Sequence, residues 1–213
     1  MKENITTLFL DIGGVLLTNG WDRKSRRLAM TTFGLEQEET EERHHLIFPL
    51  YEEAKLTLDE YLDSVIFHTE RNFTREDFKA FMFNQSAPIE GSIEYFKLLK
   101  AQHQLKVVAV NNEGIEINEY RIQKYKLGEL IDSFISSCYM HIRKPDVAIF
   151  DMACNIAHVS PGQVLYIDDR HIFVELASKL GIRSYQFTGV NDAKSFMQTV
   201  NFLITTKELT ATV

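Results

Sequence analysis

The stretch Leu8-Phe9-Leu10-Asp11-Ile12-Gly13-Gly14-Val15-Leu16 brings an apolar run, one carboxylate and two glycines together near the start of the chain. Its apolar residues stand at successive positions, which is typical of a strand covered on both faces, and we expect that strand over Thr7 to Leu10. A carboxylate at the end of a buried strand is unfavourable unless another group pairs with it. The rest of the chain must therefore supply partners for Asp11.

The composition is that of a globular protein with room for a large core. The chain has 213 residues, of which 45% are hydrophobic and 25% charged, and this length suffices for one large domain or for a core domain with a small insert. Its net charge of −7 argues against a general nucleic-acid or acidic-membrane binder. Two isolated cysteines, no signal peptide and no run of roughly 20 apolar residues together predict a cytoplasmic protein without a membrane span.

Residues 19–88 form a segment of their own, rich in charge and aromatic side chains, with helical spacing and no strand pattern. We expect helices over Arg23 to Phe33 and over Gln37 to Ile47, the second ending before Pro49. A third helix should begin at the capping box Thr57-Leu58-Asp59-Glu60, and Thr74-Arg75-Glu76-Asp77 resembles a further helix start. The sequence therefore predicts a small all-helical insert.

The remaining residues, 1–18 and 89–213, alternate between helix and strand after Pro88. Alternation of this kind predicts an α/β core with a doubly wound, Rossmann-like parallel sheet. The further strands are expected over Lys106–Val110, Ser133–Ser136, Val164–Ile167 and Ser184–Phe187. The helices are expected from a cap at Ser92, then over Glu116–Leu127, Asp146–Ile156, Val174–Leu180 and Ala193–Thr205.

Polar residues gather where these strands end, at the edge where such sheets bind ligands. They are Asp11, Gly13 and Gly14, then Asn111, Asn112 and Glu113, then Lys144 in a later loop, and Asp168, Asp169 and Arg170. Several carboxylates in one place cannot all stay ionised without a cation, and oxygen ligands favour Mg²⁺. Asp11, one of the pair Asp168 and Asp169, and the Gly13 carbonyl are the expected ligands.

Lys144 would balance these carboxylates and offer a positive charge to an anionic substrate. A carboxylate held beside Mg²⁺ and a lysine is a nucleophile suited to phosphorus, which makes Asp11 the candidate. Backbone amides around Ile12 to Gly14, with the side chain of Asn111 or Asn112, would hold the phosphoryl oxygens. This chemistry implies an aspartyl-phosphate intermediate and a small phosphorylated metabolite as partner.

Four motifs in this order resemble the haloacid dehalogenase-like hydrolase superfamily, which uses a helical insert after the first motif as a cap. They are Phe9 to Leu16, the strand ending at Val110-Asn111-Asn112, Arg143-Lys144-Pro145-Asp146, and Tyr166-Ile167-Asp168-Asp169-Arg170. The resemblance implies that Asp11 is the nucleophile and a metal ligand, and that Lys144 holds both it and the phosphate. It also implies a carbonyl ligand at Gly13, direct Mg²⁺ binding by Asp169, and a bond from Asp168 to metal-bound water or to Lys144.

The chain departs from the family pattern at two positions. Gly13 stands where the usual phosphatases have a second aspartate, whose acid–base help is typically worth ~10²–10⁴-fold. Some sugar-phosphate phosphatases of the superfamily resemble this chain in having Asp-x-Gly. Asn111 stands where the family has Ser or Thr, and it too can donate to a phosphoryl oxygen. Our hypothesis is that Glu113 supplies the acid–base function, with His171, Asp22 or a carboxylate of the helical insert as alternatives.

Three functions follow from this pattern. The first is Mg²⁺-dependent hydrolysis of small phosphomonoesters, with sugar phosphates leading by resemblance, in a monomer or homodimer. The second is a catalytically impaired protein that binds a phosphorylated ligand or a partner, because Gly13 replaces the aspartate. The third is a dehalogenase, whose attack on carbon needs no metal, and the pair Asp168 and Asp169 argues against it.

Several residues of the insert have ordinary expectations. His44, His45 and His68 are expected to be exposed, because no His or Cys cluster has zinc spacing. The basic run from Arg23 to Arg27 is expected to be a solvated helix face. Trp21 stands at the start of the insert, where either packing or contact with a substrate would explain it.

Overall fold

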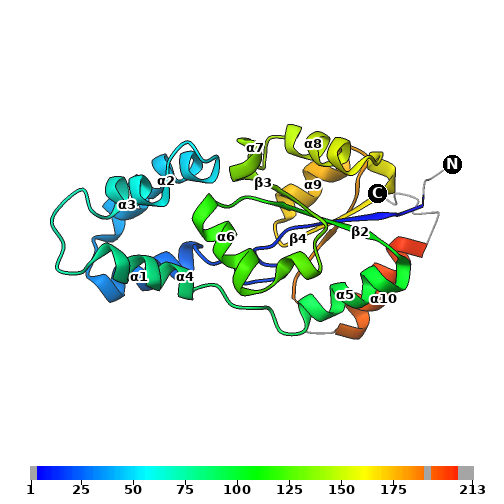
Figure 1. Cartoon of the computed structure of the whole chain (residues 1–213), viewed down its shortest axis with the longest axis horizontal. Helices are drawn as coiled ribbons and strands as arrows, with labels where there is room; N and C mark the ends of the chain where they lie inside the picture. The colour runs from blue at the N-terminus through cyan, green and yellow to red at the C-terminus, as the bar shows by residue number, and fades with distance from the viewer. Residues whose placement is uncertain (1–3, 190–192, 206–213) are drawn as a thin grey trace.

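Five parallel strands form one sheet in the computed structural model, which describes residues 4–189 and 193–205 (Figure 1). The strand order is β3-β2-β1-β4-β5, with β1 in the centre. The strands are β1 (Thr7–Leu10), β2 (Lys106–Asn111), β3 (Ser133–Ser136), β4 (Val164–Asp168) and β5 (Arg183–Gln186). The predicted α/β fold with a helical insertion after the first strand is confirmed.

The register of β1 explains why its residues are apolar without interruption. Phe9 pairs with Val108 on one side and Tyr166 on the other, so β1 is covered by a strand at each edge. Side chains of alternate residues point to opposite faces of the sheet. Leu8 and Leu10 enter the core cluster on one face, and Phe9 enters the cluster on the other.

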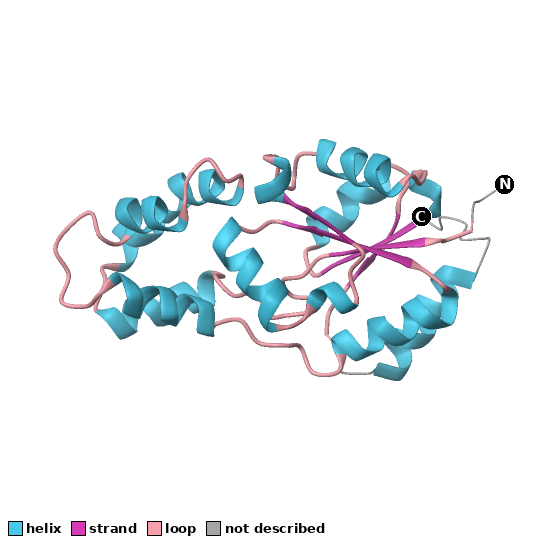
Figure 2. Ribbon diagram, viewed as in Figure 1, coloured by secondary structure: helices cyan, strands magenta, loops and turns pink. Residues whose placement is uncertain are grey.

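Helices cover both faces of the sheet (Figures 1 and 2). The core helices are α5 (Ser92–His103), α6 (Ile115–Lys124), α7 (Ser137–Met140), α8 (Ala148–Ala157), α9 (His171–Lys179) and α10 (Ala193–Thr205), with short 3₁₀ turns at Leu127–Glu129 and Pro161–Gln163. Helices α5 and α10 pack on the face of Leu8, whereas α8 and α9 pack on the face of Phe9. This double covering buries the central strands on both sides.

The first four helices after β1 form a separate lobe at the left of Figure 1, which we call the cap. They are α1 (Arg23–Phe33), α2 (Gln37–Glu52), α3 (Leu58–Val65) and α4 (Arg75–Asn84). Their buried aromatic and aliphatic side chains make a core cluster that also takes in Ile117 of α6. The predicted capping box at Thr57 is present, and the predicted helix start at Thr74 is a capping box as well. The predicted domain limits, 19–88 against 1–18 and 89–213, stay a prediction.

The end of α2 differs from the prediction, because the helix continues through Pro49 to Glu52. Proline removes one backbone donor from a helix, and tertiary contacts compensate here. The side chain of Tyr51 is fully buried, and the Glu52 carboxylate accepts a 2.7 Å hydrogen bond from Arg143 in the core. The last turn of α2 is therefore held by the contact between cap and core.

The start of α5 also differs from the prediction. Gly91, with φ of 71°, is the cap residue, and Ser92 is the first residue inside the helix. The Ser92 hydroxyl instead donates a 2.6 Å hydrogen bond to the carbonyl of Val15. Other predicted ends differ by a few residues, and both Asn111 and Asp168 are the last residues of their strands rather than loop residues.

No helix in the described part of the chain is long and apolar enough to cross a membrane.

Candidate active site

Three carboxylates meet at the carboxyl ends of β1 and β4. Asp11 follows β1 directly, and its backbone N–H donates a 2.9 Å hydrogen bond to the carbonyl of Ile167 in β4. Asp168 ends β4 and Asp169 follows it. Each of the three acids offers one oxygen, and these oxygens all lie within 4.8 Å of one another. The pairing of β1 with β4 therefore creates the cluster that the sequence predicts.

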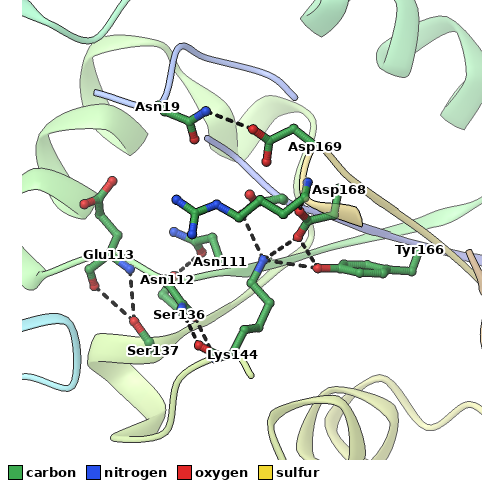
Figure 3. Close-up of polar contacts among 12 residues, drawn as sticks. Asn19, Asn111, Asn112, Glu113, Ser136, Ser137, Lys144, Tyr166, Asp168 and Asp169 are labelled. Atoms are coloured by element: carbon green, nitrogen blue, oxygen red, sulfur yellow. Dashed lines mark hydrogen bonds and ion pairs between the residues drawn. The ribbon is translucent and has the colours of Figure 1, made fainter. Parts of the chain in front are cut away.

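Lys144 is the cation at the centre of the site, and its side chain is buried (Figure 3). Its Nζ lies 3.2 Å from Asp11 Oδ1 and 2.7 Å from Asp168 Oδ2. Asp168 also accepts hydrogen bonds from the Tyr166 hydroxyl and, at 2.8 Å, from the backbone N–H of Arg170. Because these donors fix Asp168 on several sides, it holds Lys144 in place against Asp11.

The charged groups of the site shift one another's pKa values. Burial raises the pKa of Asp11 to about 7 against the opposing charge of Lys144, and Asp168 and Asp169 add to the rise. Burial lowers the pKa of Lys144, but the two carboxylates beside it outweigh burial and raise it. Lys144 is thus held as a cation. The excess of negative charge around it is the kind that a bound cation relieves.

Asn19 secures the third carboxylate, as Figure 3 shows. Its Nδ2 donates a 2.9 Å hydrogen bond to Asp169 Oδ2, across 150 positions of sequence. The other oxygen, Asp169 Oδ1, is buried and has no hydrogen-bond partner among the described residues. Burial raises the pKa of Asp169, although the Asn19 amide opposes that rise.

The acid cluster fits a divalent cation. All its donors are oxygens, which suits Mg²⁺ better than softer metals. The unpartnered Asp169 Oδ1 is a buried acceptor, and a bound metal ion is one explanation of such an atom. Asp11, Asp168 and Asp169 are the residues that would hold the ion.

The two glycines of the first motif serve different purposes. Gly14 has φ of 72°, which favours glycine, and a Cβ atom there would overlap the Asp169 carboxylate. A Cβ atom on Gly13 would lie 2.8 Å from Asn19 Oδ1. Glycine at position 14 therefore lets the turn after β1 approach the Asp169 side chain, while Gly13 leaves space that Asn19 occupies.

The turn after Asp11 leaves two backbone donors free. Gly14 N–H donates to the Leu17 carbonyl at 2.7 Å, and Leu17 N–H donates back to Ile12 at 2.9 Å. Within the described residues, the N–H groups of Ile12 and Gly13 have no hydrogen-bond partner. Free amides in a tight turn attract anions, so these two remain available for the predicted phosphate contacts.

The two asparagines at the end of β2, Asn111 in the strand and Asn112 directly after it, are engaged within the protein (Figure 3). Asn111 donates to Asn118 Oδ1 at 3.1 Å and accepts from the Ser136 hydroxyl at 2.8 Å. Asn112 makes a pair of 2.8 Å hydrogen bonds with the backbone N–H and carbonyl of Lys144. Asn112 therefore positions Lys144, and the role of either side chain in phosphate binding stays a prediction.

The three named candidates for acid–base chemistry occupy different places. Glu113 is buried and its carboxylate pairs with Arg121. Asp22 caps α1 by accepting a 2.8 Å hydrogen bond from Ser25 N–H. Both Glu113 and Asp22 line the cavity described below, whereas His171 is exposed and is not among the lining residues. Burial raises the pKa of Glu113 to about 7 against the charge of Arg121.

A cavity of about 980 Å³ extends from Asp11 and Lys144 to the cap. Two cap residues that line it contradict the sequence prediction of exposure. His44 is buried, with its ring tilted 4.5 Å from that of Phe48. Arg26 is buried too, and its guanidinium forms two 2.9 Å hydrogen bonds with Glu41. Both lie on cap faces that turn toward the core rather than toward solvent.

Sequence reasoning missed Asn19 and Tyr166 as parts of the site. Tyr166 lies two residues before Asp168 on one strand, a spacing that places both side chains on the same face. Asn19 carries no such signal, because its position follows from the turn that Gly14 and Leu17 close. The spacing rule would have found the tyrosine, and only the fold reveals the asparagine.

Comparison with known proteins gives one matching family and several similar folds. A family profile described as haloacid dehalogenase-like hydrolase matches residues 5–179. A D-ribitol-5-phosphate phosphatase of Bacteroides thetaiotaomicron is 24% identical over 190 residues, which cover 85% of this chain and 91% of the relative.

Two groups of solved structures share the fold. A haloacid dehalogenase family enzyme of the same organism, in complex with magnesium and inorganic phosphate, has a TM-score of 0.74 at 22% identity and covers 90% of this chain and 98% of its own. A dehalogenase has a TM-score of 0.64 at 19% identity, covering 88% and 87%. Since the profile spans most of the chain and the motif residues meet at one site, this chain belongs to the haloacid dehalogenase-like hydrolase family.

Proposed function

We propose that this protein hydrolyses phosphomonoesters of small hydroxylated metabolites with Mg²⁺, through a phosphoryl group carried on Asp11. The contact that carries the proposal is the one between Lys144 Nζ and Asp11 Oδ1, at 3.2 Å in a buried setting. A carboxylate held by a fixed cation is oriented for attack, and the charge of Lys144 opposes the rise in the pKa of Asp11 that burial causes.

The first step transfers the phosphoryl group to the protein. One oxygen of Asp11 attacks phosphorus, the bond from phosphorus to the ester oxygen breaks, and that oxygen leaves as an alcohol after taking a proton. The free N–H groups of Ile12 and Gly13, together with Lys144, would bind the phosphoryl oxygens and stabilise their developing charge. In the second step water attacks the phosphorus, which releases phosphate and restores the Asp11 carboxylate.

Mg²⁺, when bound by Asp11, Asp168 and Asp169, would supply a compact positive charge to the transferred group. The magnesium and phosphate bound in the similar enzyme of Bacteroides thetaiotaomicron support this assignment. The Gly13 carbonyl is the further ligand that we propose, because glycine at this position leaves the backbone accessible.

The proton for the leaving alcohol is assigned to Glu113. This carboxyl lines the cavity, and burial brings its pKa to about 7, which suits an acid–base group near neutral pH. Its partner Arg121, which also donates to the carbonyl of Thr18, holds it in a fixed orientation.

The substrate class rests on the cavity and on the relative. A volume of about 980 Å³ is much larger than a phosphate group requires, so it has room for an organic part. The relative acts on D-ribitol 5-phosphate, which makes pentitol and sugar monophosphates the first compounds to assay.

The decisive assay tests a panel of phosphomonoesters with the purified wild type, once with Mg²⁺ and once with EDTA. The Asp11→Asn variant is tested on the same panel with Mg²⁺. We expect release of phosphate only from the wild type with Mg²⁺. Binding of the esters without any turnover would favour the non-catalytic alternative that Gly13 suggests. Release of halide from a 2-haloacid, unaffected by EDTA, would favour dehalogenation and contradict the proposal.

A further inference from the structure

A chain of hydrogen bonds in the cap ends at a histidine that lines the substrate cavity. The Trp21 indole N–H donates to the Tyr61 hydroxyl oxygen at 2.9 Å. That hydroxyl lies 2.8 Å from Nδ1 of His44. Trp21 precedes α1, His44 belongs to α2 and Tyr61 belongs to α3, so three segments of the cap are tied together.

The direction of this chain follows from its donors. An indole N–H can only donate, so the Tyr61 oxygen accepts from Trp21. Within the described residues the hydrogen of this buried hydroxyl has no acceptor other than His44 Nδ1, so it is directed to His44. His44 Nδ1 is then the acceptor, and a neutral ring carries its hydrogen on Nε2. Burial, together with the charges of Arg26 and His45, lowers the pKa of His44 to about 3, so the ring is neutral at ordinary pH.

The hydrogen on Nε2 is left for a bound molecule. Among the described residues, His44 Nε2 has no hydrogen-bond partner. It is also absent from the set of fully buried side-chain atoms that lack a partner, so it keeps some exposure. His44 and Asp11 line the same cavity. Since Phe48 packs on one side of the ring and Tyr61 fixes Nδ1, the orientation of the Nε2 donor is set in advance.

The groups around His44 indicate which kind of oxygen its Nε2–H can bind. Arg26, whose charge acts on His44, is already paired through two nitrogens with Glu41. Glu36 and Glu38 also line the cavity, and so does the cation Arg23. A neutral imidazole N–H beside an arginine that is already paired suits an uncharged oxygen, such as that of a hydroxyl or carbonyl group.

We propose that His44 is a specificity-determining residue whose Nε2 hydrogen binds an uncharged oxygen of the substrate's organic group. Trp21 and Tyr61 act as positioning residues that fix the tautomer. The protein would therefore prefer monophosphates of hydroxylated compounds to phosphate esters without hydroxyls. This inference rests on the proposed function, because it assumes that the phosphate end lies at Asp11.

Two substitutions separate the nitrogens of the ring. The amide nitrogen of glutamine takes approximately the place of Nε2, whereas that of asparagine takes approximately the place of Nδ1. We expect His44→Asn to lower kcat/KM for a pentitol phosphate about tenfold, mainly through KM, and His44→Gln to keep most of the wild-type value. For phenyl phosphate, which has no hydroxyl group, both variants should stay within about twofold of the wild type.

The matched control is His68→Asn, the same change at a cap histidine outside the cavity lining. It should leave the preference for pentitol phosphate over phenyl phosphate unchanged. Equal losses on both substrates in His44→Asn would overturn the inference, and so would an unchanged preference.

Nitrogen NMR of the histidine rings tests the tautomer without any turnover. We expect a single Nε2–H tautomer for His44 in the wild type and a mixture of tautomers in Tyr61→Phe. If the wild type hydrolyses no ester, the proposed function fails, and a titration with pentitol phosphate still tests the site. A shift of the His44 Nε2–H signal would support the contact, and an unmoved signal would overturn it.

Discussion

The side-chain oxygen of Asn19 lies 2.8 Å from the point that a Cβ atom on Gly13 would occupy. The amide nitrogen of the same side chain donates to Asp169. The space in which the second aspartate of the usual motif would begin is thus filled by an asparagine from the start of the cap. Restoring that aspartate must displace a group that holds the acid cluster.

We therefore predict that Gly13→Asp alone brings no gain of activity and lowers stability, by roughly 1–3 kcal/mol, the usual cost of an overpacked site. Asn19→Ala removes the atom in contact, so Gly13→Asp should cost at least about 1 kcal/mol less in that background. Denaturant unfolding of the wild type, both single variants and the double variant measures this coupling. Additive effects would show that Asn19 does not limit position 13.

Gly14 should tolerate alanine even less well than Gly13. The positive φ alone costs about 1–2 kcal/mol for a residue with a Cβ atom. At Gly14 the added atom would also meet the Asp169 side chain, with the two Cβ atoms 2.8 Å apart. We expect Gly14→Ala to lower both stability and Mg²⁺ affinity, measured by thermal unfolding and by calorimetric titration with Mg²⁺.

Gly34 is the control for that experiment. It has a similar φ of 64°, and an added Cβ atom would meet nothing within 4 Å. Gly34→Ala should therefore carry the conformational cost alone and keep wild-type Mg²⁺ affinity. Equal losses of stability and affinity in the two variants would mean that the contact with Asp169 has no effect.

Stability should depend on pH through His44. An unfolded histidine titrates near 6.5, whereas burial and the charges of Arg26 and His45 lower the pKa of His44 to about 3 in the folded protein. The unfolded state thus binds more protons between these values, so the contribution of His44 is complete above pH 6.5 and is lost as pH falls toward 3. Between pH 7 and 5 the loss should be about 2 kcal/mol.

Denaturant unfolding at both pH values checks this. His44→Gln should remove that part of the pH dependence, and His68→Gln should keep it. If His44→Gln lost as much stability as the wild type between pH 7 and 5, the low pKa of His44 would be refuted.

Glu113 should shape the pH dependence of turnover. As a proton donor it must be protonated, and burial raises its pKa to about 7, so the rate should fall as pH rises above 7. We expect Glu113→Gln to lower kcat about 10²-fold and to abolish that fall. An unchanged pH profile would exclude Glu113 and direct attention to Asp22, which also lines the cavity.

The sheet and its charged edge were predictable because they depend on local rules. A continuous apolar run identifies β1, and parallel strands bring their carboxyl ends together. Asp11, Asp168 and Asp169 therefore had to converge once the strand order placed β1 beside β4. Lys144 joins them from a loop, and its position needed the family pattern as well.

The cap was less predictable because tertiary contacts decide its details. The sequence predicts that the second helix ends before Pro49. The buried side chain of Tyr51 and the hydrogen bond between Arg143 and Glu52 instead stabilise one more turn, so the helix ends at Glu52. His44 and Arg26 look like surface residues, since polar side chains on a helix usually face solvent. In this fold they face the cavity between cap and core, which no local pattern encodes.

The central claim is that Asp11 carries the phosphoryl group during turnover. The most direct measurement is mass spectrometry of protein quenched in acid during reaction with a pentitol phosphate and Mg²⁺. We predict one added phosphoryl group, located on the peptide that contains Asp11 and lost in the Asp11→Asn variant. A phosphoryl group on another residue, or turnover that persists in Asp11→Asn, would contradict the account.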